Sequence, residues 1–219
     1  MHTETELPLF FVKINLANID SRGNFDEAGV APVIYQEKIR NRSLTNTHFN
    51  HFRPNAPIHP TNDNTISFSS NSKTFRRVNG AQDRISILWQ LAGIARAAPA
   101  SIMPGTDFTI TVAGSRDVDV WHIKVLGMEE LRVNGKHYQA WHLQRLARPG
   151  SYESTLDIWL APAIEWMPVR ILSTENNGET RDLSLTKINI KPAPPPPAVV
   201  ATPVSTPAPT FNMSQPNPP

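Results

Sequence analysis

The segment that decides the fold is residues 152–190, where three apolar stretches follow one another with only short turns between them. YESTLDIWL at 152–160 ends at Ala161-Pro162, MPVRIL occupies 167–172, and RDLSLTKINI occupies 181–190 after an Asn-Asn-Gly turn. Alternation of apolar and polar residues is typical of strands, and such short turns join antiparallel neighbours. The segment therefore predicts an antiparallel meander, and no catalytic motif is evident in it.

The rest of the chain extends the same architecture. Further strands are predicted at residues 7–17, 32–39, 45–52, 65–68, 107–113, 118–126 and 136–146. Asn134-Gly135 predicts a tight hairpin turn, because both residue types tolerate positive φ. We therefore expect a mainly β protein with a curved antiparallel meander of roughly nine strands, forming an open or partial barrel, because a sheet of this size must curl or be covered.

One helix is predicted within this meander, at about residues 80–97. Asn79 and Gln82 fit a capping box, and Asp83 adds negative charge near the helix start, where it caps the helix or anchors it to the sheet. Apolar residues then recur at helical spacing, and Pro99 ends the pattern. The helix is amphipathic, and we expect its apolar face to cover the concave side of the sheet.

The C-terminal segment differs in composition from the rest of the chain. Residues 191–219 contain 11 prolines among 29 residues and a single charged residue, Lys191. Such a segment buries too little apolar surface to offset the entropy of ordering it. We expect a β-rich domain over residues 1–190 and a disordered proline-rich tail over residues 191–219, which serves as a spacer or a polyproline ligand.

Composition argues against several classes of function. The net charge is only +2 and no block of like charges occurs, so nucleic acid is not an expected partner. The chain has no cysteine, which removes disulfides and thiolate metal sites. No apolar run approaches the roughly 20 residues of a membrane span, and no export signal is recognisable, so the chain as written is expected in the cytoplasm.

The polar motifs do not assemble into a recognisable catalytic or metal site. His48 and His51 are three residues apart and face opposite sides of a strand, so we expect no metal and no cofactor. Asp117 and Asp119 share a strand face, and together with Asp157 they are the only basis for a carboxylate-dependent hydrolase. No nucleophile elbow or phosphate-binding loop is present. We therefore predict a non-enzymatic protein without catalytic residues.

The five tryptophans are the candidate ligand-lining residues. They are Trp89, Trp121, Trp141, Trp159 and Trp166. Aromatic side chains line apolar ligand pockets, but they also fill ordinary cores, and the sequence allows both interpretations.

An ordered set of short motifs resembles a bacterial family catalogued as domain of unknown function 3108, over roughly residues 7–190. The motifs are Ser21-Arg22-Gly23, Pro32, YQEK at 35–38, AQDRIS at 81–86, VAGSRDV at 112–118, LQRLARPG at 143–150, LDIWLAP at 156–162 and MPVRI at 167–171. The resemblance implies an exported, periplasmic or envelope-associated β-rich protein, and it supplies no site residues. It also implies that this chain lacks the first strands of the family domain.

Two functional hypotheses follow. In the first, the protein is a bacterial envelope protein that binds an apolar or lipid-like small molecule in an elongated cavity between the helix and the sheet. In the second, it is a structural or scaffolding protein for cell-envelope integrity, with a filled core, no ligand and an envelope protein as its partner.

Overall fold

The computed structural model describes residues 2–9, 12–39, 42–50, 64–147 and 154–189, and it describes side chains from residue 18 onward. Met1–Lys187 form one compact unit. The expected tail at residues 191–219 lies outside the described residues. Mainly β structure with one inserted α-helix is confirmed.

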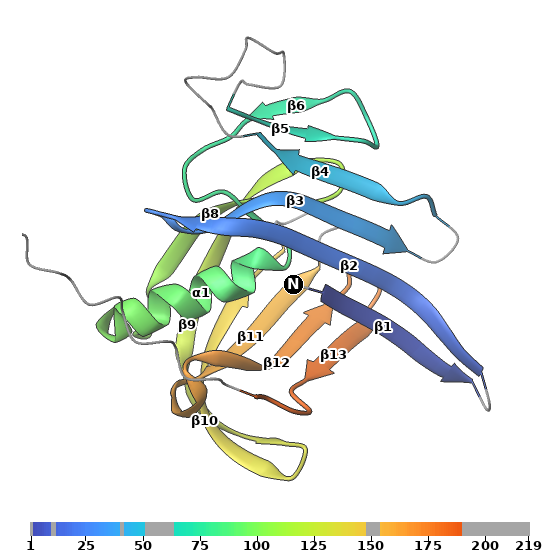
Figure 1. Cartoon of the computed structure of the whole chain (residues 1–219). Coiled ribbons are helices and arrows are strands. Elements are labelled where there is room, and N and C mark those ends of the chain that lie inside the picture. Colours follow the sequence, from blue (N-terminus) through green and yellow to red (C-terminus); the bar gives the residue numbers. More distant parts are fainter. Residues whose placement is uncertain (1, 10–11, 40–41, 51–63, 148–153, 190–219) are drawn as a thin grey trace, which may run out of the picture. The chain divides into compact units, whose positions relative to one another are not determined.

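Thirteen strands, rather than roughly nine, form two sheets in the described residues (Figure 1). The six-stranded sheet, in the order β1 to β6, consists of β1 (His2–Leu9), β2 (Val12–Asp26), β3 (Gly29–Ile39), β4 (Thr45–Phe49), β5 (Thr65–Phe68) and β6 (Thr74–Arg76). The seven-stranded sheet, in the order β13 to β7, consists of β7 (Gln82–Asp83), β8 (Asp107–Ala113), β9 (Val118–Val133), β10 (Lys136–Arg145), β11 (Thr155–Ala161), β12 (Met167–Thr174) and β13 (Thr180–Ser184).

The meander predicted from residues 152–190 is confirmed as β11, β12 and β13, which pair antiparallel in sequence order. The 3₁₀-helix η2 (Pro162–Ile164) occupies the proline turn between the first two of these strands. The hairpin turn is also confirmed, because Asn134 and Gly135 have φ values of 46° and 80°. Every pairing within the seven-stranded sheet is antiparallel except the short one between β7 and β8.

The N-terminal strand prediction differs from the structure. A single strand was expected over residues 7–17, but β1 and β2 are two strands of a hairpin that meet at Leu9 and Val12. Residues 10 and 11 lie outside the described residues. Alternation continues through both strands, and therefore the apolar pattern alone does not reveal the reversal.

The helix also begins later than predicted. α1 spans Ser86–Ala97, whereas Gly80 has a φ of 75° and belongs to a turn, and β7 pairs with β8. The Asn79–Gln82 capping box does not form, since the Gln82 amide donates to the carbonyl oxygens of Val30 and Gly80. A second 3₁₀-helix, η1 (Pro99–Ser101), follows α1.

Asp83 and Ser86 form the capping box instead. Asp83 Oδ1 accepts hydrogen bonds from the backbone N–H groups of Ile85 and Ser86, and Ser86 Oγ accepts one from the Asp83 N–H, each at 2.8 Å. Asp83 Oδ2 accepts a 2.6 Å bond from Ser21 Oγ on β2. Asp83 therefore both caps α1 and attaches its start to the six-stranded sheet.

Three clusters of buried apolar side chains make up the core. The first joins α1 to one face of the seven-stranded sheet, here called the helix-facing face. The second joins the six-stranded sheet, through Tyr35, Phe49, Ile66 and Phe68, to Ala81, Ile85 and Ala113 near the start of α1. The third lies on the opposite face of the seven-stranded sheet, here called the outer face, and includes Trp159 and Val169.

Candidate functional site

The structure separates the five tryptophans instead of bringing them around one cavity. Trp121, buried, and Trp141 and Trp166, partly buried, belong to the helix-facing cluster. Trp159 is buried on the outer face, and Trp89 on α1 is 40% exposed. Only three of the five predicted lining residues therefore share an environment.

Apolar side chains pack the centre of the interface between α1 and the seven-stranded sheet. Ile87, Leu91 and Ala95 of α1 are almost completely buried against Val112, Ile123, Leu143 and Ile158. Neither of the two hollows described next is an elongated apolar cavity along the buried face of α1. The larger of these, about 560 Å³, lies at the β3–β4 junction. The smaller, about 280 Å³, lies between Gln90 and Ile94 of α1 and residues 109–111 of β8.

An apolar surface remains open beside the helix. Leu143, Ile158, Ile171 and Leu183 face one another across β10, β11, β12 and β13. Leu143 and Ile158 are fully buried, Ile171 is partly buried, and Leu183 is 44% exposed. The helix-facing face is therefore covered at β10 and becomes uncovered toward β13.

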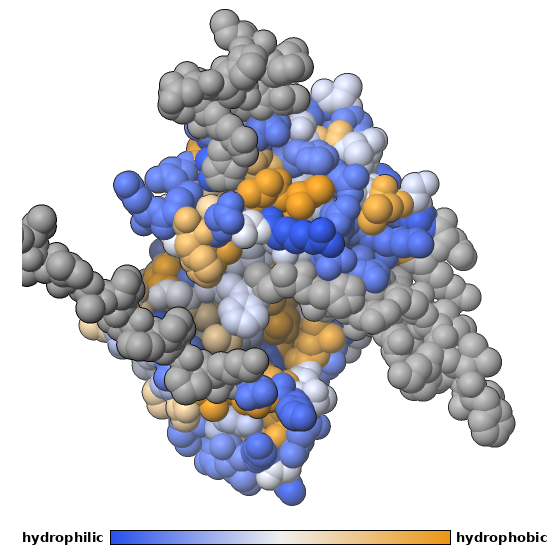
Figure 2. All heavy atoms as spheres, viewed as in Figure 1, coloured by the Kyte–Doolittle hydropathy of each residue, from blue (hydrophilic) through white to orange (hydrophobic). Residues whose placement is uncertain are grey.

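We define the apolar strip as Trp141, Leu156, Trp166, Ile171 and Leu183. The first four are partly buried, and Leu183 is exposed. Figure 2 shows apolar side chains, coloured orange, within a recess below α1, in the region where Figure 1 places β11 and β12. In the next row of the sheet, Leu156 is followed by Ser173 and Arg181, so polar side chains border the strip on one side.

Trp166 is held in an unusual backbone conformation. Glu165 and Trp166 have φ values of 61° and 60°, a region that bulky residues rarely adopt. The Trp166 N–H donates to the Ala161 carbonyl oxygen at 3.0 Å, and Glu165 forms a 3.1 Å ion pair with Arg96 in the last turn of α1. The turn that carries Trp166 is thus attached to both the sheet and the helix, and such strain is often retained at functional positions.

The outer face carries a polar network that the sequence did not reveal. His142 places Nδ1 2.9 Å from Glu129 Oε1 and Nε2 2.7 Å from Asp157 Oδ1. Its ring stacks on Trp159, whose indole N–H donates to Glu129 Oε2 at 2.9 Å. The Trp159 and His142 hydrogen bonds hold the pKa of Glu129 below its ordinary value. Each ring nitrogen of His142 therefore faces a carboxylate oxygen, one from Glu129 and one from Asp157.

The same network extends along the face to β12 and β13. Arg170 lies 5.1 Å from the ring centroid of Trp159 and forms a paired hydrogen bond with Asp182. This contact raises the pKa of Arg170 and lowers that of Asp182. Each carboxylate of the network has a side-chain hydrogen-bond partner, which is the arrangement expected of a structural network.

The carboxylates considered for hydrolysis do not converge. Asp119 lies 3.5 Å from Arg145, whose guanidinium stacks over the helix-facing Trp121, whereas Asp157 belongs to the outer-face network. Asp117 lies exposed in the turn before β9. The three groups are therefore distributed over different surfaces of the sheet.

The histidines do not gather either. His48 is exposed on β4, and His51 lies outside the described residues. His122 and His137 each face one carboxylate, from Asp107 and Glu130 respectively. Among the described residues, no group of three histidine, aspartate or glutamate side chains is arranged to hold a metal ion. The described part of the chain also has no helix that combines the length and apolar character of a membrane span.

Comparison with known proteins identifies a family to which the chain is similar. A family model described as "Protein of unknown function (DUF3108)" matches residues 3–186, which include the helix and, apart from His2 of β1, all of the strands described above. No curated protein and no solved structure matches the chain.

Proposed function

The chain belongs to the DUF3108 family, and we propose that it is a non-enzymatic protein that binds the acyl chain of a lipid-like molecule along its apolar strip. The observation that carries this proposal is the increasing exposure of apolar side chains from Leu143 to Leu183 on the helix-facing face. Water-exposed apolar surface of this kind is stabilised when a ligand covers it.

The shape of the strip favours an extended ligand. Ile171 on β12 and Leu183 on β13 are neighbours about 4.8 Å apart, and Leu156 and Trp141 extend the apolar surface to β11 and β10. Trp141 and Trp166 contribute flat aromatic surfaces, and Ser173 and Arg181 supply polar groups along one border. An acyl chain can lie along the strip while its polar end stays near that border.

Trp166 has a specific role in this proposal. Its positive φ holds the residue at the turn between β11 and β12, and the Arg96–Glu165 ion pair ties this turn to α1. The strained turn places the tryptophan beside the strip before any ligand binds. Preorganisation of this kind reduces the ordering cost of binding.

The tryptophans allow a direct test with brominated fatty acids, which quench indole fluorescence on contact. One variant keeps Trp141 and Trp166 and replaces Trp89, Trp121 and Trp159 with phenylalanine. The control variant keeps only Trp159, which lies on the outer face. We expect saturable quenching in the first variant and none in the control.

A second test uses neighbouring residues on the edge strand β13. Leu183 belongs to the helix-facing row, whereas Ser184 faces the outer side, and both are exposed. Leu183→Lys is expected to weaken displacement of a fluorescent fatty acid by about tenfold, and Ser184→Lys is expected to leave it unchanged. Equal effects of the two substitutions, or quenching of Trp159 alone, would reject the strip as the binding surface.

We also propose that the protein acts in the bacterial envelope, on the basis of the family resemblance. Fractionation of cells that express the native gene with a C-terminal tag tests this location. Recovery of the tagged protein entirely in the cytosolic fraction would contradict it. The ligand proposal is independent of this result.

A scaffolding role is the second candidate, and β13 is the observation that favours it. All five residues of this edge strand are exposed, and an open sheet edge can pair with a strand of another protein. In that case cross-linking through β13 should recover an envelope partner, and deletion of the gene should increase detergent sensitivity. Unchanged detergent sensitivity would count against scaffolding but not against lipid binding.

A further inference from the structure

The larger hollow, about 560 Å³, lies where the loop after β3 meets the turns between β5 and β6 and between β8 and β9. Its lining combines one acidic residue, two arginines, several hydroxyl groups and two apolar side chains. It is separate from the apolar strip, with which it shares no lining residue. Its volume lies within the range of small-molecule sites.

Glu37 is the unusual member of this lining. The residue is only 8% exposed, and its Oε2 atom is buried without a hydrogen-bond partner in the described structure. Tyr35, two residues earlier on the same face of β3, is also buried, and both burial and the nearby Glu37 raise the pKa of its hydroxyl above the ordinary value. A buried carboxylate oxygen without a partner is costly, and a ligand that donates a hydrogen bond removes this cost.

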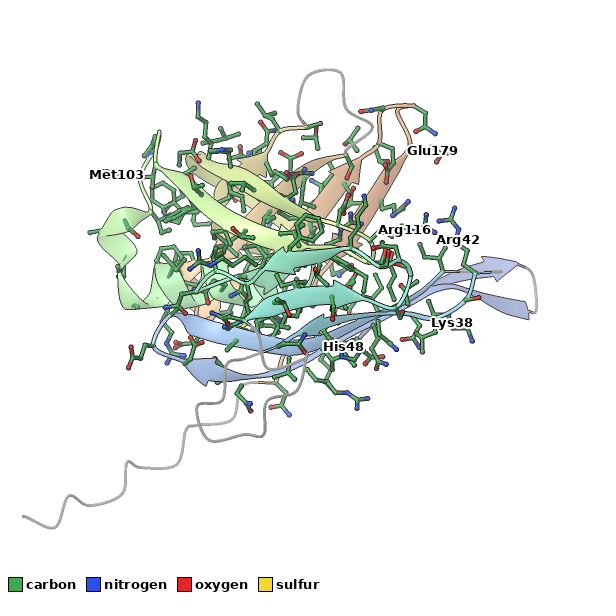
Figure 3. The ribbon with its side chains drawn as sticks, turned by 90° about the horizontal axis from the view of Figure 1, so that it is seen from above. Lys38, Arg42, His48, Met103, Arg116 and Glu179 are labelled. Atoms are coloured by element: carbon green, nitrogen blue, oxygen red, sulfur yellow. The ribbon has the colours of Figure 1, made fainter. Side chains whose placement is uncertain are left out.

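Two guanidinium groups complement this acceptor. Arg42 and Arg116 are exposed and line the same hollow, and Figure 3 shows them close together at this end of the molecule. Neither forms an ion pair within the part of the chain that the structure describes. Arginine binds phosphate and carboxylate groups through its planar set of N–H donors.

The wall that carries Arg116 is fixed by hydrogen bonds. Ser70 Oγ donates to the Ser115 carbonyl oxygen at 2.6 Å, and the Asn71 amide donates to the Arg116 carbonyl oxygen at 3.0 Å. On the facing side, the Asn46 N–H donates to Ser69 Oγ at 2.8 Å. The two turns are thus held together, and the hydroxyl groups of Ser43 and Ser115 add further polar atoms to the lining.

The Glu37 carboxylate and the two guanidinium groups together limit the kinds of ligand that this hollow can bind. A simple anion would be repelled by Glu37 in the lining, and a metal ion would meet one carboxylate and two repelling arginines. A molecule that carries an ammonium group and a phosphate satisfies both sets of groups. Ile39 and Leu44, which are 36% and 51% exposed, can contact the carbon atoms of such a molecule.

We propose that this hollow binds a primary ammonium group on Glu37 and the attached phosphate on Arg42 and Arg116. The same chemistry occurs in free phosphoethanolamine and in the headgroup of an ethanolamine phospholipid. The site does not depend on the apolar strip, so each proposal can fail without the other.

The test is calorimetric titration of the full chain with O-phosphoethanolamine, phosphocholine and inorganic phosphate. Phosphocholine has the same charges but no N–H donor, and phosphate has no cation. We expect saturable binding of phosphoethanolamine and at least about tenfold weaker binding of the other two, because a hydrogen bond to a charged group has this effect on affinity. Equal affinity for phosphoethanolamine and phosphocholine would overturn the role of Glu37.

Substitutions test separately the contribution of Glu37 and the contribution of the arginines to binding. Glu37→Gln keeps the side-chain shape and is expected to abolish the preference for phosphoethanolamine over phosphocholine. Arg116→Gln is expected to weaken the binding of phosphoethanolamine, phosphocholine and inorganic phosphate alike. Lys38→Gln, on the opposite face of β3, is the control and should leave all three affinities unchanged. The comparison of ligands on the unmodified protein remains decisive if Glu37→Gln does not fold.

Vesicles distinguish the two sources of the ligand. Sedimentation with phosphatidylethanolamine vesicles, compared with phosphatidylcholine vesicles, tests the headgroup of a membrane lipid. Binding to the first alone, lost in Arg116→Gln, assigns the site to the lipid headgroup, while binding only of free phosphoethanolamine assigns it to the soluble molecule. If the protein binds neither free phosphoethanolamine nor phosphatidylethanolamine vesicles, the proposal is rejected.

Discussion

At the scale of single residues, Asp83 has the most consequential contacts. It is completely buried and accepts hydrogen bonds from Ser21 Oγ and from the backbone N–H groups of Ile85 and Ser86. Asp83→Ala removes the helix cap and leaves the Ser21 hydroxyl buried without this partner. We expect a loss of about 2–4 kcal/mol in the free energy of unfolding, measured by urea denaturation. A loss below about 0.5 kcal/mol would show that the cap does not connect helix and sheet.

Asp83 is also expected to make the stability of the folded protein depend on pH. Burial raises the pKa of Asp83 above its ordinary value of 3.8, so the folded state holds this proton more tightly than the unfolded state. Its contribution to stability is therefore complete below pH 3.8 and decreases as the pH rises through the folded-state pKa. Asp83→Asn keeps an acceptor for the cap but does not titrate.

Comparison of these two proteins by urea denaturation at a series of pH values isolates the effect. We expect the stability of the wild type relative to Asp83→Asn to fall as the pH rises above 3.8, and then to level off. Parallel pH profiles for the two proteins would contradict the raised pKa.

Residues also show what the sequence can and cannot reveal. Asp83 was recognised as a cap or anchor because an acidic side chain at a helix start has a local signature. Glu37 and His142 had no such signature, because their environments arise from turns and strands that are distant in sequence. For Glu37, the only available signal was its alternation with the buried Tyr35, which puts a charged side chain on an inward face.

At the scale of elements, turns were more predictable than boundaries. The Asn134-Gly135 turn needs only two residues with positive φ, and both can be identified from the sequence because asparagine and glycine tolerate this conformation. The helix start was misplaced by six residues, from 80 to 86, because residues 82 and 83 pair with β8 instead of joining the helix. The pairing of residues 82 and 83 with β8 is a tertiary contact, and therefore it cannot be predicted from the local sequence pattern.

The glycine inside α1 gives a prediction for this element. Gly93 has an ordinary helical backbone, and a Cβ atom added there would meet nothing within 4 Å. Gly93→Ala is expected to stabilise the protein by about 1 kcal/mol, because alanine loses less backbone entropy in a helix. Gly135→Ala is the matched control, and it should destabilise the protein because its φ is 80°. Thermal denaturation of both variants tests whether Gly93→Ala stabilises the protein and Gly135→Ala destabilises it. Destabilisation by Gly93→Ala would contradict the prediction.

At the scale of the whole molecule, the sequence predicted the fold class but not the division into two sheets. Strands β1 to β6 and β7 to β13 follow in order along the chain, so a single meander and two successive sheets have the same apolar pattern. The division depends on residues 77–83, where the chain leaves β6 and enters the seven-stranded sheet. The expected disorder of the proline-rich tail remains a prediction.

The contacts between the sheets predict that they unfold together. Tyr35, Phe49 and Phe68 of the six-stranded sheet share a core with Ile85 and Ala113, and Thr47 Oγ1 donates to the Gly114 carbonyl oxygen at 2.7 Å. All five tryptophans lie between residues 89 and 166, in α1, the seven-stranded sheet or the turn between β11 and β12. Tryptophan fluorescence therefore reports on that part alone, whereas far-ultraviolet circular dichroism reports on both sheets.

Phe49→Ala tests this coupling from the sheet that has no tryptophan. Phe49 is 1% exposed, and its truncation is expected to cost about 3–5 kcal/mol. If the sheets form one cooperative unit, the fluorescence transition in urea should shift to lower denaturant by the same amount as the circular dichroism transition. Leu44→Ala, at an exposed position in the same sheet's β3–β4 loop, should leave both transitions in place. An early loss of circular dichroism with an unchanged tryptophan transition would instead show that the six-stranded sheet unfolds independently, and the shared core would then contribute little to the stability of the seven-stranded sheet.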